Sequence, residues 1–208
     1  MDRRHFLQLT ALTASTTTAL SFASQAMAQK IDTNAILNDP DAPTGGNPKG
    51  DVTIVAFFDY NCPYCKQAAP DLERVVKEDG NIRLVYKDWP ILTEASVYGA
   101  QVALAAKYQG AYDKVHHALM AIPGKRISQD TMREAVQKSG VDLKRLQADV
   151  DTHGKSILAL LKRTAAQADS LDLAGTPVYL IGPFKTPTLD YDGFKRAVAE
   201  ARARQAKK

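Results

Sequence analysis

Cysteine is nearly absent from this chain. Its 208 residues contain only Cys62 and Cys65, separated by a Pro-Tyr dipeptide. A structural zinc site built from thiolates needs four ligands, so the chain lacks half of one. Structural disulfides in exported proteins usually close long loops, whereas this pair would close a ring of four residues and constrain the unfolded chain very little. The scarcity of cysteine indicates that these two thiols serve chemistry rather than stability.

Long hydrophobic runs are also missing. The most apolar stretch, residues 7–22, is interrupted by Thr and Ser and falls short of the ~20 apolar residues that cross a bilayer. A basic pair precedes this stretch, and a small-x-small pattern follows it and ends at Ala28. This order predicts a cleaved export signal over residues 1–28 and a mature chain that begins at Gln29 in the periplasm.

The export route has two interpretations. The order Arg3-Arg4 followed by a weakly hydrophobic segment resembles a twin-arginine signal. Asp2 stands where that signal usually has Ser or Thr, so the general secretory route is the alternative. A lipid anchor is excluded because no cysteine lies near the cleavage pattern.

Neither sign of charge dominates the chain. It has 27 Lys and Arg against 23 Asp and Glu, a net charge of +4 that is spread along the sequence. A nucleic-acid interface would need a basic stripe interleaved with aromatic residues, and the sequence has none. We therefore expect no nucleic-acid partner.

The segments around the two cysteines have a recognisable order. Residues 52–58 are almost continuously apolar, which predicts a strand buried on both faces. The following stretch, about residues 62–78, has apolar residues at helical spacing and carries Pro63 where the first turn of a helix tolerates proline. A thiol at a helix start has a lowered pKa, so Cys62 is expected to be the exposed, reactive thiolate and Cys65 the buried, protonated partner.

The rest of the chain predicts a small α/β sheet with a long helical insertion. A short helix at 33–37 precedes a lead-in rich in Pro and Gly, residues 39–48, which is expected to break regular structure. Strands are expected at 81–86 and 178–181, with a poor final strand after Ile181. Apolar periodicity predicts helices at 94–107, 110–121, 128–138, 142–150, 153–171 and 191–205.

Three motifs together resemble the DsbA family of exported thiol–disulfide oxidoreductases. They are Phe-Phe-Asp-Tyr-Asn-Cys-Pro-Tyr-Cys-Lys at 57–66, Lys-Asp-Trp-Pro-Ile-Leu at 87–92 and Gly-Thr-Pro at 175–177. The Pro63-Tyr64 dipeptide and the Thr before the last proline are closer to the ScsC and DsbG types. The resemblance implies a thioredoxin-like fold over residues 51–208, with an all-helical insertion at about 92–171 and a lead-in at 29–50.

The resemblance also implies the surroundings of the redox pair. Pro177 is expected in the cis form against the disulfide, and the Thr176 main chain is expected to pair with an extended substrate. We expect the Thr176 hydroxyl to favour the thiolate through a hydrogen bond worth about 1 kcal/mol. One departure stands out, because Ala56 occupies the position where most thioredoxin-like proteins carry a buried carboxylate. Asp59 and Lys66 are the candidates for the proton route that this carboxylate would otherwise provide.

The predicted function is thiol–disulfide exchange on exported cysteine-containing proteins, through Cys62 and Cys65 and without a metal or other cofactor. A membrane protein of the DsbB or DsbD type would be the redox partner, and the short, broken lead-in predicts a monomer. Two other functions compete with this one. The two thiols would suit a Cu(I)-handling protein, although the chain has no Met-rich tract. A chaperone-like binder would use an apolar groove near Trp89, which is either a groove residue or a core residue.

Overall fold

The computed structural model describes residues 31–207. The predicted export signal over residues 1–28 and its cleavage site lie outside the described residues. No helix between residues 31 and 207 is long and apolar enough to cross a membrane.

The centre of the molecule is a five-stranded mixed sheet with the order β1-β3-β2-β4-β5. β2 and β3 run parallel, and β4 and β5 continue the sheet in antiparallel pairing. The parallel pair requires a crossover, which the helix that begins directly after Cys62 provides. The strands comprise Thr44–Gly46 (β1), Val52–Phe58 (β2), Ile82–Asp88 (β3), Val178–Ile181 (β4) and Phe184–Thr186 (β5).

The lead-in forms an edge strand where the sequence predicted a break. Residues 44–46 pair antiparallel with β3, Thr44 opposite Val85 and Gly46 opposite Arg83. An edge strand of three residues needs backbone pairing and little side-chain packing, so glycines do not prevent it. Gly46 has a φ of 65°, and a Cβ there would lie 2.4 Å from the carbonyl oxygen of Ile82, so this close pairing requires glycine.

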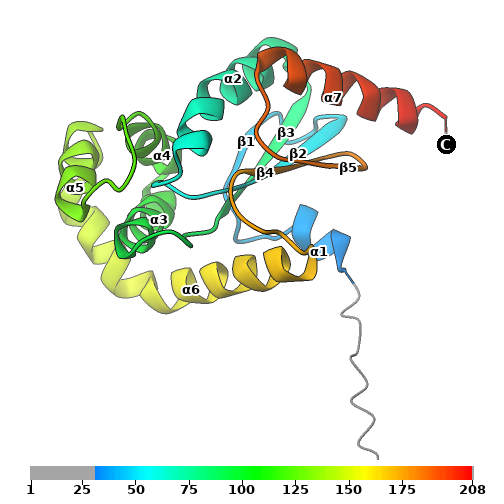
Figure 1. Ribbon diagram of the computed structural model, residues 1–208. Helices are drawn as coiled ribbons and strands as arrows, with labels where there is room; N and C mark the ends of the chain where they lie inside the picture. The colour runs from blue at the N-terminus through cyan, green and yellow to red at the C-terminus, as the bar shows by residue number, and fades with distance from the viewer. Residues whose placement is uncertain (1–30, 208) are drawn as a thin grey trace, which may run out of the picture.

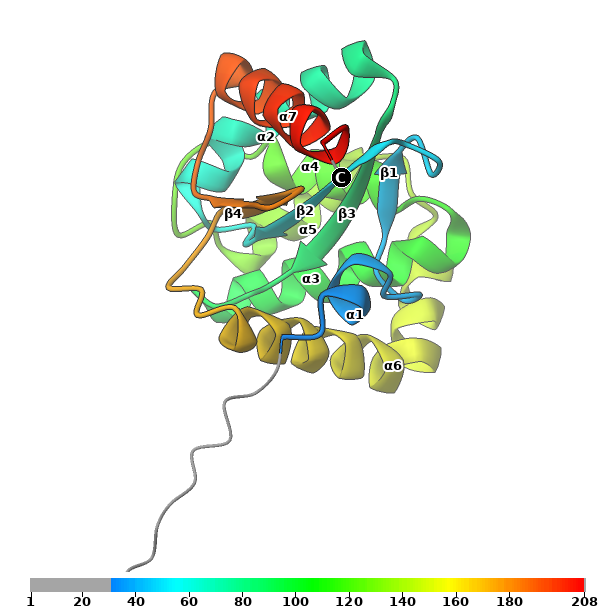
Figure 2. The same cartoon turned by 90° about the vertical axis from the view of Figure 1, so that its right-hand side faces the viewer.

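Helices cover both faces of the sheet, as Figures 1 and 2 show. α2 (Pro63–Asp79) and α7 (Tyr191–Gln205) lie on one face, whereas α1 (Thr33–Leu37) and the C-terminal part of α6 (Leu143–Ser170) lie on the other. Successive side chains of β2 alternate between these two faces. Ala56 and Phe58 belong to the core beneath α2, and Phe57 belongs to the smaller core beneath α1 and α6.

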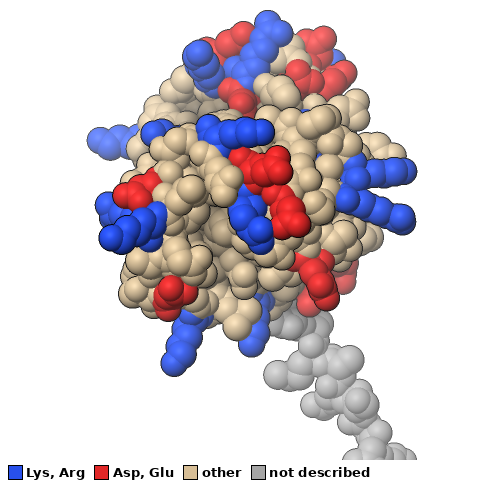
Figure 3. All heavy atoms as spheres, turned by 90° about the vertical axis from the view of Figure 1, so that its left-hand side faces the viewer, with Lys and Arg blue, Asp and Glu red and all other residues tan. Residues whose placement is uncertain are grey.

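The insertion is helical throughout, as predicted. It comprises α3 (Glu94–Ala106), a 3₁₀ turn (Lys107–Gln109), α4 (Tyr112–Met120), α5 (Gln129–Lys138) and α6. Lys and Arg are interspersed with Asp and Glu over this side of the molecule (Figure 3).

The prediction of two helices at 142–150 and 153–171 is wrong, because α6 runs unbroken through both. Gly154 costs only about 1 kcal/mol relative to alanine within a helix. Packing against α3 offsets that cost, and the His153 ring stacks on Tyr108 with their centroids 3.6 Å apart. The predicted thioredoxin-like α/β sheet with an inserted helical region is otherwise confirmed.

A buried ion pair joins the lead-in to the sheet and the insertion. The Lys87 ammonium, fully buried on β3, lies 3.2 Å from an Asp39 oxygen, and Arg163 on α6 contacts both oxygens of Asp39 at 2.8 and 2.9 Å. Burial alone would raise the pKa of Asp39, but the charges of Arg163 and Lys87 lower it to about 2. The residues before β2 are thus part of the domain and not a separate tail.

Candidate active site

Cys62 occupies the N-cap of α2. Its backbone is extended, with φ −78° and ψ 115°, and its sulfur accepts a hydrogen bond from the Cys65 backbone N–H at 3.3 Å. Its carbonyl oxygen accepts from the Lys66 N–H at 3.2 Å. The first N–H groups of a helix lack intrahelical partners and carry the positive end of its dipole. Sulfur at this position therefore gains stability when it carries a negative charge.

The two thiols have opposite acidities, as the sequence predicted. The Cys65 thiol, together with the backbone N–H groups of Cys65 and Tyr64, lowers the pKa of Cys62 to about 6, although burial opposes this. Burial raises the pKa of Cys65 far above its usual range, and the neighbouring Cys62 sulfur adds to this effect. At neutral pH the pair therefore holds one thiolate and one thiol, the arrangement that a thiolate nucleophile and a protonated partner require.

Cys62 is less accessible than the sequence suggested. Its exposed fraction is 3 %, against an expectation of an exposed thiolate, and that of Cys65 is 1 %. The segment before β4 lies against the sulfur, because the Cys62 thiol donates to the Thr176 carbonyl oxygen at 3.2 Å. Tyr64, between the two cysteines, is 61 % exposed.

The Thr176–Pro177 peptide bond is cis, as expected, and Pro177 is buried. The contact that Thr176 makes differs from the predicted one. Its hydroxyl oxygen is buried and has no hydrogen-bond partner among the described residues, and its carbonyl oxygen binds the Cys62 thiol instead. A thiolate cannot donate this bond. The Thr176 carbonyl therefore favours the protonated form of Cys62, whereas the Cys65 N–H at the helix start favours the charged form.

Asp59 organises the turn that leads into Cys62. One carboxylate oxygen accepts from the Asn61 N–H at 2.6 Å and the Ser96 hydroxyl at 2.7 Å. The other accepts from the backbone N–H groups of Ile91 and Leu92 at 2.8 and 3.0 Å. Four donors therefore fix a carboxylate that is 1 % exposed. The sequence suggested a proton route through Asp59, but these contacts give it a positioning role.

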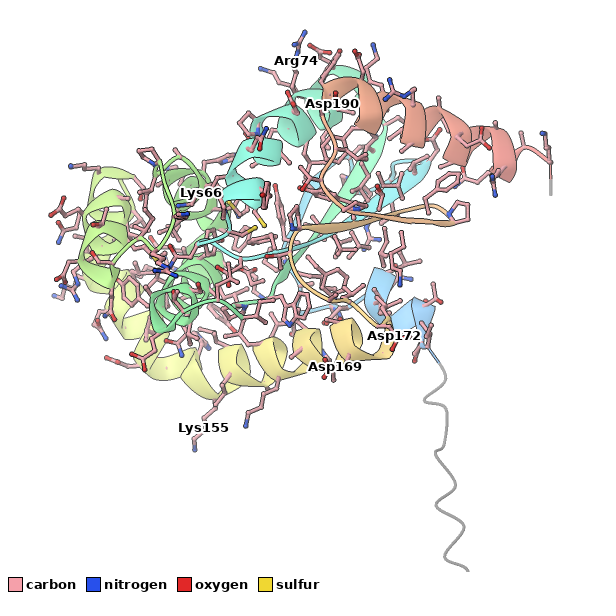
Figure 4. All side chains as sticks on the ribbon, viewed as in Figure 1. Lys66, Arg74, Lys155, Asp169, Asp172 and Asp190 are labelled. Carbon is pink, nitrogen blue, oxygen red and sulfur yellow. The ribbon has the colours of Figure 1, made fainter. Side chains whose placement is uncertain are left out.

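Asn61 fastens the insertion to the same turn. Its side-chain amide donates to the Thr93 hydroxyl at 2.7 Å and to the Ile127 carbonyl at 3.2 Å, and its oxygen accepts from the Ile127 N–H at 2.6 Å. The Lys66 ammonium, at the first turn of α2, lies 3.4 Å from the Gly124 carbonyl of the same loop (Figure 4). Sequence reasoning missed Asn61, although the Asp-x-Asn pattern just before Cys62 was a visible signal.

A second buried polar cluster lies under the insertion, and the sequence did not predict it. The Tyr112 hydroxyl donates to one oxygen of Asp88 at 2.9 Å, and the other oxygen of Asp88 is buried without a partner among the described residues. Burial raises the pKa of Asp88 to about 7. Close by, the Tyr60 hydroxyl pairs with His116 Nδ1 at 3.0 Å, and burial lowers the pKa of His116 to about 3. His116 is therefore a neutral core residue.

Neither the adjacent pair His116 and His117 nor Trp89 forms a binding site. His117 pairs with Glu73 at 3.1 Å on the surface, away from the buried His116. Trp89 is 6 % exposed and packs edge-on against Phe57 on the sheet face opposite α2, so it is a core residue. Within residues 31–207, no group of three or more His, Cys, Asp or Glu side chains is placed to hold a metal ion.

A family model described as Thioredoxin matches residues 38–200. The chain belongs to this family. The matched range contains the whole sheet, the insertion and both cysteines, so the family assignment covers the site as well as the scaffold.

Solved structures of thiol–disulfide proteins share this fold. A thioredoxin-like oxidoreductase from Silicibacter pomeroyi is 39 % identical, with a TM-score of 0.77 over 83 % of this chain and 98 % of that one. The thiol-disulfide exchange protein alpha-DsbA2 from Wolbachia pipientis is 26 % identical, with a TM-score of 0.75 over 80 % and 90 %. The catalytic domain of Proteus mirabilis ScsC is 26 % identical, with a TM-score of 0.71 over 82 % and 94 %. The resemblance to DsbA-type and ScsC-type proteins is confirmed.

Curated relatives include proteins of a different overall size. A Salinispora tropica protein named Na(+)/H(+) antiporter NhaA 3 is 30 % identical over 177 residues, which are 80 % of this chain but 26 % of that protein. This chain thus spans about a quarter of the length of the antiporters that it matches. A Bacillus anthracis protein named probable disulfide bond formation protein D is 24 % identical over 164 residues, 75 % of its length.

The geometry predicts how the acidity of Cys62 depends on its neighbours. In the reduced protein, Cys62 should titrate near pH 6, so that about nine-tenths of it is thiolate at pH 7. Cys65→Ala removes the largest influence that lowers this pKa and should raise it. Thr176→Val should leave it nearly unchanged, because the hydroxyl that it removes has no hydrogen-bond partner among the described residues and the carbonyl contact remains. The rate of Cys62 alkylation, measured against pH, gives the Cys62 pKa in the native protein and in both variants. A rate that reaches half its maximum near pH ~8.5 in the native protein would contradict the N-cap argument.

The Asp88 cluster predicts a pH-dependent stability. The folded pKa of Asp88 is about 7 against an ordinary 3.8, so the stability of the native protein falls as pH rises from about 3.8 to about 7 and changes no further above 7. Asp88→Asn, which resembles the protonated form, should not show this fall. Relative to the native protein, it should gain about 3 kcal/mol of stability between pH 5 and pH 9. Urea unfolding at the two pH values tests this, and equal effects at both would contradict it.

Proposed function

We propose that this chain is a periplasmic thiol–disulfide oxidoreductase that exchanges disulfides with exported proteins through Cys62 and Cys65. One observation carries the proposal, namely the opposite acidities of two thiols at the start of α2. A structural pair would not need a sulfur placed as a helix N-cap with a pKa of about 6. The membership of the thioredoxin family and the likeness to the Wolbachia thiol-disulfide exchange protein support it.

The exchange proceeds in two displacements at sulfur. When the chain oxidises a substrate, a substrate thiolate attacks Cys62 of the enzyme disulfide and Cys65 leaves with the electron pair and takes up a proton. A second substrate thiolate then attacks the substrate sulfur of the mixed disulfide and expels Cys62 as a thiolate. The substrate loses two electrons, and the enzyme pair gains them. Reduction of a substrate disulfide runs through the same mixed disulfide in the opposite direction.

The surroundings of the pair favour an intermediate oxidising strength. A stabilised Cys62 thiolate favours the reduced enzyme and so makes its disulfide a better oxidant. The pKa of about 6 lies between the ~7 of thioredoxin and the ~3.5 of DsbA. Tyr64 supplies a phenol and no positive charge between the cysteines. We propose that the pair is a weaker oxidant than the strongest members of the family, whose reduction potential is about −120 mV.

Exposed apolar side chains border the pair and suit an unfolded substrate. Tyr64, Ile91 and Leu92 are 61, 44 and 49 % exposed, and Asp59 holds the last two beside the turn that leads to Cys62. Thr176 offers its main chain beside the same sulfur for strand-like pairing with an extended segment. Cysteine-containing segments of incompletely folded exported proteins have the matching chemistry.

The location, assembly and partners complete the proposal. The chain would be exported, cleaved after Ala28, act as a monomer without metal or other cofactor, and exchange electrons with a membrane protein of the DsbB or DsbD type. Intact-mass analysis of the protein recovered from the periplasm should show a chain that begins at Gln29. A product that retains Met1 would contradict the export signal.

The two cysteines predict distinct outcomes when they are replaced. Cys65→Ala should accumulate mixed disulfides between Cys62 and substrate, because the resolving thiol is missing, whereas Cys62→Ala should form none. Non-reducing electrophoresis of periplasmic extracts shows these adducts directly. The matched control is the double variant, which should neither form adducts nor support oxidative refolding of a reduced test protein. Full activity of that double variant would favour a non-catalytic binding function instead.

A further inference from the structure

The thiol of Cys65 must lose a proton before it can attack, yet nothing acidic or basic stands where the family usually places a carboxylate. Cys65 is 1 % exposed, and burial raises its pKa far above the usual range. Ala56, on the sheet beneath α2, has no polar atom in its side chain. A buried thiol without a proton acceptor would attack slowly at neutral pH, so the proton needs another path.

The two candidates from the sequence do not provide that path. Asp59 uses both carboxylate oxygens to accept four hydrogen bonds, which hold the turn before Cys62. Lys66 directs its ammonium to the carbonyl of Gly124 in the insertion, and Figure 4 shows it on the side of α2 that faces the insertion. The Asp59 carboxylate is thus already saturated with donors, and the Lys66 ammonium, which donates and has no lone pair, cannot receive the proton of Cys65.

Two tyrosines flank Ala56 in the sheet. In the strand register, Ala56 is opposite Tyr179 on β4 and opposite Tyr86 on β3. Side chains of directly paired residues project to the same face of a sheet, so both tyrosines share the face of Ala56, beneath α2. Both belong to the core cluster that contains Cys62 and Cys65.

The two tyrosines differ in the charges that act on their pKa. Burial raises the pKa of Tyr179, and the charges of Cys65 and Cys62 raise it further. Burial also raises the pKa of Tyr86, but there the neighbouring charges are Asp113, Glu73 and Asp88.

The position of Tyr179 in the chain agrees with this difference. Tyr179 comes two residues after Pro177, in the segment whose Thr176 carbonyl lies 3.2 Å from the Cys62 sulfur. The Phe194 ring from α7 packs edge-on against the Tyr179 ring, with centroids 4.9 Å apart, and holds it in place. No described residue forms a hydrogen bond with the Tyr179 hydroxyl, which leaves that group available.

We propose that the Tyr179 hydroxyl relays the proton of Cys65 to and from solvent, in place of the missing carboxylate at Ala56. This inference rests on the proposed function. In the resolving step, Cys65 gives its proton to the Tyr179 oxygen while Tyr179 gives its own proton to water. The Cys65 sulfur then bonds to Cys62, the bond from Cys62 to the substrate sulfur breaks, and the substrate leaves as a thiolate that takes a proton from solvent. The enzyme pair is oxidised and the substrate sulfur is reduced.

The relay returns Tyr179 to its starting state. A phenol whose pKa is raised stays neutral throughout the working pH range, so it passes one proton on as it receives another. When the enzyme disulfide is attacked by a substrate, the same path runs backwards and protonates the departing Cys65 sulfur.

A two-phase reaction separates this inference from the function on which it rests. Reduced protein mixed with excess dithiobis(nitrobenzoate) releases one nitrobenzoate thiolate when Cys62 attacks and a second when Cys65 resolves the mixed disulfide. Tyr179→Phe should leave the first phase unchanged and slow the second by about tenfold or more at pH 7. The deficit should shrink as pH rises, because hydroxide then removes the proton. Tyr86→Phe is the matched control and should leave both phases unchanged.

The outcomes distinguish the possibilities. A normal second phase in Tyr179→Phe would overturn the relay. Equal slowing in Tyr86→Phe, or a deficit in Tyr179→Phe that does not change with pH, would show a packing effect and would also overturn it. A second phase in the native protein that is slower in deuterated water, with this slowing reduced in Tyr179→Phe, would support it. A native protein without a first phase would contradict the proposed function itself.

Discussion

The site depends on the hydrogen bond from the Cys65 backbone N–H to the Cys62 sulfur. This bond makes a cysteine the N-cap of α2, a place that Ser, Thr, Asp or Asn usually fills. A neutral thiol is a weak acceptor, whereas a thiolate is a strong one and also meets the positive end of the helix dipole. The helix is therefore capped best when Cys62 is ionised, which links the start of α2 to the chemistry of the pair.

The remaining contacts determine how far that ionisation proceeds. The Thr176 carbonyl binds the Cys62 thiol and favours its protonated form, while the buried Cys65 thiol favours the thiolate. Asp59 and Asn61 hold the preceding turn against the β3–α3 connection and the α4–α5 loop. The insertion is thus a structural part of the site, because two of its segments set the position of the turn from which Cys62 projects.

The sequence predicted the parts of this arrangement that depend on local pattern. A continuous apolar run, a proline in the first turn and two thiols three positions apart indicated strand, helix and redox pair. The Thr-Pro motif indicated the segment that closes over the sulfur. The order in which helices and strands follow each other was clear, although β1 was missed because Gly45 and Gly46 carry no β propensity. The unbroken α6 was missed because its contacts with α3 are tertiary.

The unpredicted parts arise from contacts between residues far apart in the chain. Asp59 and Ser96 are 37 positions apart, and Asp88 and Tyr112 are 24 apart. Neither pairing leaves a periodic signal. The burial of Cys62 was missed for the same reason, since the covering carbonyl of Thr176 lies 114 positions away. The sequence could identify the reacting atoms, but only the fold shows which groups hold and titrate them.

The equilibrium of the Cys62–Cys65 pair with glutathione tests the central claim most directly. The claim is that the N-cap sulfur gains more from ionisation than a thiol in water, and that this gain makes the disulfide an oxidant of intermediate strength. The account predicts a reduction potential between the ~ −270 mV of thioredoxin and the ~ −120 mV of the strongest oxidants of the family. A potential at or below ~ −270 mV would show that the cap does not favour the reduced pair, and would contradict the account.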